Sequence, residues 1–225
     1  TPDLKRGHIY PKYAAMIESV DQSLGSIVKK LEELNLSDNT IIIFTSDNGG
    51  HGKWTSNYPF KGNKGNLYEG GIRVPLIVKW SNKIKSSLIL EDIVIGNDFY
   101  PTILEMAELT LIPKQHIDGV SLWPLLKSRK KIKRNKLFWH FPNYIGAGHP
   151  GRAKPSSVIR KGKWKLIENL ENGEVELFDL KNDVSEKTDL SNKLKKKVLE
   201  LKNELNNWRI SVNAQMPMVN DNYIK

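Results

Sequence analysis

The chain has 225 residues, of which 39% are hydrophobic and 27% are charged, and it contains no cysteine. This composition excludes a disordered or collagen-like chain, and a chain of this length buries roughly 70% of the surface that it exposes when unfolded. Without cysteine there is no disulfide, cysteine-bound zinc, iron–sulfur cluster or cysteine nucleophile.

The formal net charge is +10, and one short segment supplies most of it. Residues 127–136 contain seven of the 35 basic residues and no acidic one, which leaves 28 basic against 25 acidic residues elsewhere. We interpret this segment as a solvated basic loop between two domains. The alternative is a patch that attracts nucleic acid, a membrane surface or a sulfated polymer. No aromatic residues are interleaved with the basic ones, which disfavours single-stranded nucleic acid.

The N-terminal part of the chain predicts a helix followed by a strand. Apolar residues recur at helical spacing from Ile17 to Leu34, and Pro11 precedes them. Proline favours the first turn of a helix, so we predict an amphipathic helix over residues 12–34. The β-branched run at 40–45 predicts a strand buried on both faces, as in a parallel sheet. This order is typical of an α/β layer fold.

Glycine dominates the next stretch. Residues 49–71 hold seven of the sixteen glycines, so we expect a shaped loop there without helix or strand. Apolar runs predict strands at 74–80 and 93–95, and the first of these holds a proline that favours an edge or a strand start. A helix is expected over residues 97–109, with a proline tolerated in its first turn.

After the basic segment the pattern changes to short strands joined by tight turns. Lys161-Gly162 and Asn172-Gly173 are typical of hairpin turns. A helix follows, with apolar residues from Leu190 to Trp208 on one face. We therefore predict a small antiparallel sheet with a helix packed on it. The strands are expected at 137–141, 156–160, 163–168 and 174–178.

Two loops carry side chains suited to chemistry. Asp47 and Asn48 directly follow the predicted buried strand, and ligands bind at the carboxyl ends of strands in open α/β sheets. Their oxygens suit Ca²⁺ or Mg²⁺, although Asp-Asn-Gly also favours an ordinary turn. Lys64 is followed by Gly65 and projects a compact positive charge towards an anion, unless it belongs to an ordinary flexible basic loop.

A series of short motifs runs in order from about residue 12 to the end of the chain. They are SDNGG, KGNKGNLYEGGIRVP, DFYPTILEMA and DGVSLWPLL, followed by LFWHFPNY, IRKGKWKLI, ELFDLKNDVSEKTDL and AQMP. Together they resemble the formylglycine-dependent sulfatases of the alkaline phosphatase superfamily, above all the branch that acts on sulfated sugars and polysaccharides. YEGGIRVP is the most specific of these motifs.

The resemblance implies an α/β fold in two parts. Residues 1–130 would form the C-terminal portion of an alkaline-phosphatase-like three-layer α/β/α domain that lacks its N-terminal half. Residues 131–225 would form the small C-terminal subdomain, with antiparallel strands and a long helix.

The resemblance also implies roles for individual residues. Asp47 and Asn48 match two of the family's metal ligands, usually for Ca²⁺. Lys64 matches the lysine that holds the sulfate group and the leaving oxygen, where its charge offsets negative charge that develops in the transition state. His51 and His140 are candidates to contact the substrate, although a lone histidine is more often a structural hydrogen-bonding residue.

The chain departs from the family pattern at the nucleophile. The family makes formylglycine from Cys or Ser in the motif Cys/Ser-x-Pro-x-Arg, and none of the eleven prolines here has either residue two positions before it. Neither the family's other two metal carboxylates nor the Lys and His that assist the nucleophile have a match. We therefore expect a sulfatase fragment that holds half of a Ca²⁺ site and is inactive alone, with formylglycine in the missing N-terminal half.

The expected partners are a sulfated sugar or polysaccharide and the missing N-terminal half, with neither nucleic acid nor a membrane span. The family is commonly exported, which suggests a periplasmic or secreted protein. The alternatives are a phosphoesterase of the same superfamily, a non-catalytic module that binds sulfated glycans, and a nucleic-acid binder that uses residues 127–136.

Overall fold

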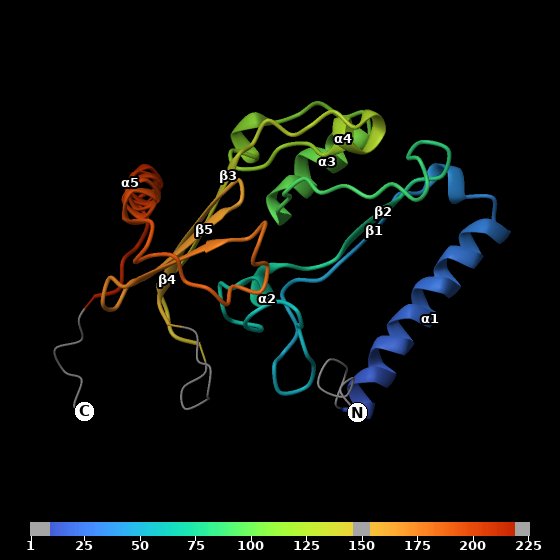
Figure 1. Cartoon of the computed structure of the whole chain (residues 1–225). Coiled ribbons are helices and arrows are strands. Elements are labelled where there is room, and N and C mark those ends of the chain that lie inside the picture. The colour runs from blue at the N-terminus through green and yellow to red at the C-terminus, as the bar shows by residue number, and fades with distance from the viewer. Residues whose placement is uncertain (1–9, 146–153, 219–225) are drawn as a thin grey trace. The chain divides into compact units, whose positions relative to one another are not determined.

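The computed structural model describes residues 10–145 and 154–218 (Figure 1). These residues divide into two compact units, which we describe separately. The middle unit consists of Gln22–Phe44 and Leu76–Arg134. The sheet unit consists of the described residues up to Asp21, of Thr45–Pro75, and of those from Asn135 onward. None of the helices in the described ranges is both long and apolar enough to cross a membrane.

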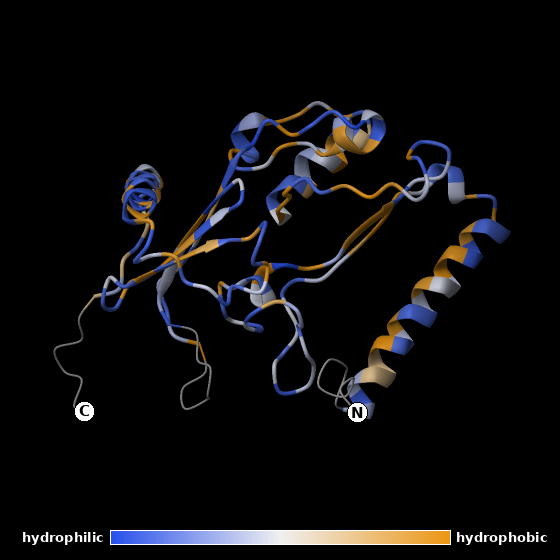
Figure 2. Ribbon diagram, in the orientation of Figure 1, coloured by the Kyte–Doolittle hydropathy of each residue, from blue (hydrophilic) through white to orange (hydrophobic). Residues whose placement is uncertain are grey.

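Helix α1 (Pro11–Glu33) confirms the predicted N-terminal helix. In Figure 2 the ribbon of α1 alternates between orange, for its apolar residues, and blue, for its hydrophilic ones. None of its residues is buried, and Ile17, Val20 and Ile27 are exposed. The helical spacing of the sequence therefore correctly predicts the helix and its apolar face, but nothing in the described residues buries that face.

Strands β1 (Ile42–Thr45) and β2 (Leu76–Lys79) pair with each other in a two-stranded sheet. Both lie within the predicted ranges. The prediction that the first strand is buried on both faces is wrong for the described residues, in which Ile42–Phe44 are half-buried. The physical reason is that a face is buried only by a layer packed on it, and the described residues cover the faces of β1 incompletely.

The predicted strand at 93–95 is also wrong, because this segment has no regular structure. Two of its backbone groups form hydrogen bonds with side chains rather than with a neighbouring strand. The N–H of Ile95 donates to Asp98 Oδ2 at 2.9 Å, and Arg134 Nη2 donates to the Ile93 carbonyl at 3.0 Å. The expected helix after it is present as a 3₁₀ turn, η3 (Gly96–Asp98), and α3 (Phe99–Met106).

One buried carboxylate organises the middle unit. Asp98 is 0% exposed and accepts the N–H groups of Ile95 and Val120. Arg134 donates to both of its oxygens at 2.7 Å. Arg134 belongs to the basic segment 127–136 and is only 12% exposed, so one of the seven cations interpreted as solvated serves a buried ion pair. The unit's other elements are η2 (Ser37–Asn39), η4 (Pro113–Gln115) and α4 (Trp123–Ser128).

The sheet unit is built on an antiparallel four-stranded sheet, as predicted. Its strands follow chain order: β3 (Lys136–Phe141), β4 (Ser156–Lys161), β5 (Trp164–Asn169) and β6 (Val175–Asp179). Both expected hairpin turns contain a glycine with positive φ, Gly162 and Gly173, a backbone conformation that glycine adopts without steric cost.

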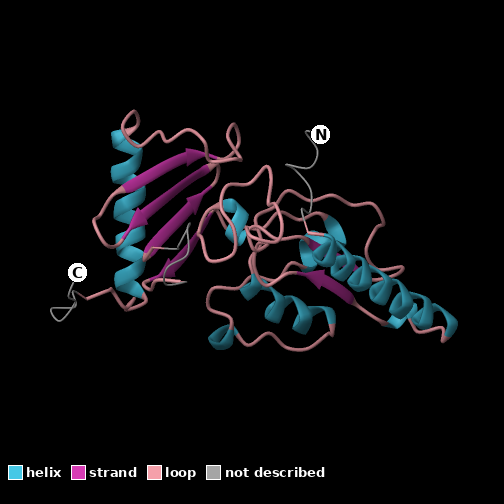
Figure 3. Cartoon of the chain, turned by 90° about the horizontal axis from the view of Figure 1, so that it is seen from below, coloured by secondary structure: helices cyan, strands magenta, loops and turns pink. Residues whose placement is uncertain are grey.

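Helix α5 (Lys195–Ser211) lies across one face of this sheet (Figure 3). It begins later than the predicted apolar face, so Leu190 and Leu194 precede it. Its Leu201 and Leu205 pack with Ile159, Leu166 and Leu177 into a core in which all five residues are 0% exposed. The opposite face of the sheet carries a second cluster of Val158, Ile167, Phe178 and Leu180, against which Leu67 and Tyr68 of the glycine-rich stretch pack.

Candidate functional site

The glycine-rich stretch forms two loops whose backbones bind each other. We call residues 46–52 the acidic loop and residues 61–69 the lysine loop. The N–H of Gly49 donates to the Gly71 carbonyl at 2.9 Å, and the N–H of Lys64 donates to the Gly50 carbonyl at 3.1 Å. The loop that carries Asp47 and Asn48 is thus joined directly to the backbone of Lys64.

The glycines permit this close approach. A Cβ atom at Gly49 would lie 1.8 Å from the Gly70 carbonyl oxygen, and one at Gly71 would lie 2.0 Å from that of Asn66. At Gly70, a Cβ would meet two carbonyl oxygens at 2.4 and 2.5 Å. The sequence expectation that this stretch contains no helix is wrong at its end, where Glu69–Ile72 form the one-turn helix α2.

Replacing Gly70 by alanine is expected to destabilise the sheet unit, because the new methyl group would meet backbone oxygens that cannot rotate away. Overpacking of this kind typically costs about 1–3 kcal/mol. Urea unfolding followed by the indole resonances of Trp164 and Trp208 measures the loss. Gly96→Ala is the control, since a Cβ there has nothing within 4 Å. Equal midpoints for the two variants would contradict the prediction.

The predicted metal ligands lie at the end of β1. Asp47 is exposed, Asn48 is half-buried, and Ser46 Oγ donates to the Asn48 carbonyl at 3.0 Å. In the described part of the chain, no three His, Cys, Asp or Glu side chains gather into a potential metal cage. The chemistry of the two donors suits a hard cation. Two side-chain ligands supply only part of the six to eight oxygens that Ca²⁺ takes.

Lys64 is exposed, and its ammonium has no hydrogen-bond or ion-pair partner among residues 10–145 and 154–218. His51 is also exposed, and its Nδ1 accepts the N–H of Lys53 at 3.2 Å. The Lys64 ammonium and Nε2 of His51 have no partner among the described residues and are available to a ligand.

His140 differs from these residues because both of its ring nitrogens are engaged. It lies on β3, where Nδ1 is 2.6 Å from Ser157 Oγ and Nε2 is 2.6 Å from the Gln215 carbonyl oxygen. These contacts connect the segment after α5 to the sheet. A contact between His140 and a substrate therefore requires one of the two bonds to break.

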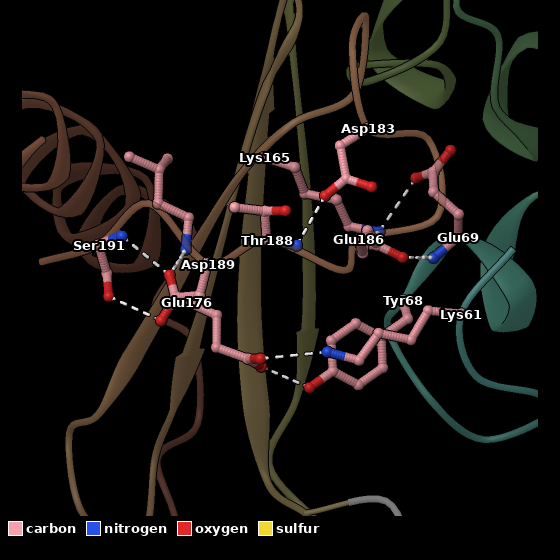
Figure 4. Close-up of polar contacts among 11 residues, drawn as sticks. Lys61, Tyr68, Glu69, Lys165, Glu176, Asp183, Glu186, Thr188, Asp189 and Ser191 are labelled. Carbon is pink, nitrogen blue, oxygen red and sulfur yellow. Dashed lines mark hydrogen bonds and ion pairs between the residues drawn. The ribbon is translucent and has the colours of Figure 1, made fainter. Parts of the chain in front are cut away.

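A buried charged cluster lies where the lysine loop meets the sheet (Figure 4). Lys165 Nζ is 3.0 Å from Glu69 Oε1 and 2.9 Å from Glu186 Oε1. Burial raises the pKa of Glu186, although the Lys165 ammonium opposes that rise. Arg160 and Arg73 each lie 3.6 Å from Glu69 Oε2. Glu69 and Arg73 belong to the YEGGIRVP motif, whereas nothing in the sequence analysis pointed to Lys165 and Glu186.

The start of the lysine loop is tied to the neighbouring strand. Lys61 Nζ lies 3.2 Å from Glu176 Oε1 and 4.0 Å from the centre of the Tyr68 ring. The Tyr68 hydroxyl donates to the other oxygen of Glu176 (Figure 4), and burial together with this bond raises the pKa of Tyr68. A hollow of about 340 Å³ opens beside Gly65, lined in part by Asn66, Tyr68 and Glu176.

Comparison with known proteins decides the family. The profile of the C-terminal part of N-sulphoglucosamine sulphohydrolase matches residues 61–211, and the sulfatase profile matches residues 2–109. The chain belongs to the sulfatase family. The prediction from the motifs is thus confirmed, and the four-stranded sheet and α5 lie within the range 61–211.

Individual sulfatase relatives agree with this assignment. A sulfatase of Formosa agariphila is 37% identical over 92% of this chain and 41% of its own length. The structure of Ps i-CgsB in complex with k-i-k-neocarrahexaose has a TM-score of 0.74 at 30% identity, over 87% of this chain and 42% of that one. BT4656, solved with its substrate D-glucosamine-2-N,6-O-disulfate, has a TM-score of 0.75 at 28% identity, over 91% and 41%. The chain spans about two fifths of the length of these relatives.

Proposed function

We propose that this chain supplies one side of the active site of a carbohydrate sulfatase. The reaction would be hydrolysis of a sulfate ester, R–O–SO₃⁻, to R–OH and sulfate. The observation that carries the proposal is that the ammonium of Lys64 has no partner among the described residues, while the backbone of Lys64 is bonded to the loop of Asp47 and Asn48. Two sulfatase relatives were solved with bound carbohydrate, and that of BT4656 is sulfated, which supports a sulfated sugar as the substrate class.

In this proposal Lys64 binds the sulfate oxygens and stabilises the negative charge that develops on them and on the leaving oxygen. Asp47 and Asn48 would provide two of the ligands of a Ca²⁺ ion. That ion, when bound, supplies Lewis acidity and orients the reacting groups. The hollow beside Gly65 has hydroxyl, amide and carboxylate groups, which suit the hydroxyls of a sugar ring. His51 is a further candidate to contact the sugar.

The nucleophile motif of the family does not occur in these 225 residues. We therefore propose that turnover requires the part of a sulfatase that this chain does not span, including formylglycine and the remaining metal carboxylates. The chain alone is expected to bind inorganic sulfate but not to hydrolyse 4-nitrophenyl sulfate. Hydrolysis by the purified chain would contradict this division of the active site.

Lys64→Ala is expected to weaken sulfate binding at least ~10-fold, because an ionic hydrogen bond contributes about 1.5–3 kcal/mol. The measurement is an NMR titration of the backbone amide resonances of residue 64 and Gly65 with sodium sulfate, at an ionic strength held constant with sodium chloride. Lys193→Ala is the matched control, since it removes the same charge from another exposed lysine of the sheet unit. Equal weakening in both variants would show that only the net charge matters and would overturn the role of Lys64.

Sulfate binding without turnover has a second explanation, which is a non-catalytic module for sulfated glycans. The exposed side chain of Lys64 suits sulfate binding alone as well as catalysis. Adding the remaining part of a sulfatase distinguishes the two functions. Hydrolysis of a sulfated sugar by the combined parts supports the enzyme, whereas binding without hydrolysis supports the module.

A further inference from the structure

The ammonium of Lys165 lies in an environment that is costly for a charge. It sits on β5, and its side chain is 0% exposed. Strand alternation places it on the same face as Ile167, and its partner across the sheet on β6 is Phe178. Removing a lysine ammonium from water costs several kcal/mol, which close ion pairs repay only in part.

Two carboxylates from other segments surround this charge. Glu69 starts α2 at the end of the lysine loop, and Glu186 lies in the connection between β6 and α5. Their side chains are 1% and 0% exposed. Glu186 Oε2 also accepts the N–H of Glu69 at 2.7 Å. The three charged groups therefore join three separate segments at one buried point.

A buried ion cluster is weak evidence that a fold is stable, because apolar side chains of similar volume often stabilise the folded state as much or more. Its more specific property is that it accepts one arrangement only, since any shift leaves a buried charge without its partner. The position of Glu69 on the sheet is therefore defined more narrowly than apolar packing of Leu67 and Tyr68 would define it.

The lysine loop is held at both of its ends. At its end, Glu69 forms an ion pair with Lys165 on β5. At its start, Lys61 forms an ion pair with Glu176 on the adjacent strand β6 (Figure 4). The two ends also meet, because the N–H of Gly70 donates to the Lys61 carbonyl at 2.7 Å. Lys64 lies between these anchors, so their positions determine where its backbone lies.

We propose that Lys165 is a positioning residue for Lys64. Its buried ammonium, bound by Glu69 and Glu186, docks the lysine loop on the C-terminal sheet and holds Lys64 where it meets a sulfate group. The docking itself is independent of any ligand, whereas its purpose rests on the proposed function. The sheet strands β4 to β6 need no part of this cluster for their own hydrogen bonds.

Amide hydrogen exchange of the full chain tests the docking. In Lys165→Met, the amides of residues 61–73 are expected to exchange at least ~10-fold faster, while those of β4–β6 keep their protection. Glu186→Gln keeps an oxygen for the Glu69 N–H, so it is expected to accelerate the exchange of the same amides by a smaller factor. It decides the question if Lys165→Met does not fold. Lys163→Met is the matched control, because Lys163 belongs to the same β4–β5 hairpin as Lys165. This variant breaks the ion pair between Lys163 and Asp179, but the Lys163 side chain is 43% exposed.

The sulfate titration tests the purpose of the docking on the same variants. Lys165→Met is expected to raise the sulfate dissociation constant about 10-fold and reduce the response of the Lys64 resonance, with Lys163→Met unchanged. Unchanged loop exchange in Lys165→Met and Glu186→Gln, or equal acceleration in the strands, would overturn the docking. Faster loop exchange with unaltered sulfate binding would overturn the positioning role. If the unaltered chain shows no sulfate response at Lys64, the proposed function fails, whereas the exchange comparison still decides the docking.

Discussion

Lys165→Met is expected to lower the free energy of unfolding of the sheet unit by about 3–5 kcal/mol, because it leaves the carboxylate of Glu186 buried without its cation and leaves Glu69 with only the two more distant arginines, Arg73 and Arg160. The distances of 3.0 and 2.9 Å show that both depend on the same ammonium. Urea unfolding, followed by the indole resonances of Trp164 and Trp208, gives the value.

Removing all three charges together should restore most of this loss. The variant Glu69→Gln/Lys165→Met/Glu186→Gln retains the shapes of the side chains and removes the three most deeply buried charges. Arg160 and Arg73, which are 21% and 50% exposed, lose their contact with Glu69 in this variant. Lys163→Met breaks a pair in which the lysine is 43% exposed and Asp179 keeps hydrogen bonds from Asn182 and the Lys181 N–H, so it should cost about 1 kcal/mol or less. If Lys165→Met is no more destabilising than Lys163→Met, the buried cluster contributes nothing beyond a surface contact.

Arg134→Met is expected to have an effect of similar size on the middle unit. Asp98 would lose both hydrogen bonds from the guanidinium and keep a negative charge at 0% exposure, which typically costs about 3–5 kcal/mol. Trp80 and Trp123, whose rings lie 5.3 Å apart in this unit, report its unfolding through their indole resonances.

Arg129→Met is the control for Arg134. It removes the same charge from the same basic segment, but Arg129 is exposed. It should change the free energy of unfolding of the middle unit by no more than about 0.5 kcal/mol. A large loss in both variants would mean that the segment acts through its summed charge, not through the single buried pair.

Local patterns predicted much of the fold. The sequence alone displays the helical spacing of α1, the short strand segments β3 to β6 and the glycines of two hairpin turns, because each depends on neighbouring residues. The strand predicted at 93–95 failed for a physical reason: its backbone groups bind Asp98 and Arg134, and the second of these lies about forty residues away. No local pattern records such a bond.

The candidate site shows the same division. Asp47, Asn48 and Lys64 were found from their motifs, and the structure adds that backbone bonds connect their loops. Lys165 could have been suspected, because a lysine occupies an inward position of a strand otherwise flanked by apolar residues. Its two carboxylate partners could not, since they come from positions 69 and 186.

The sequence by itself determined the sulfatase family and the strands of the C-terminal sheet, because motif and periodicity are properties of neighbouring residues. It also supplied the candidate residues for binding sulfate and a cation, which remain a prediction. Only the tertiary structure decided which charges are buried together and what holds Lys64. The physical reason is that the free energy of a buried charge depends on partners brought from distant parts of the chain, and folding alone selects those partners.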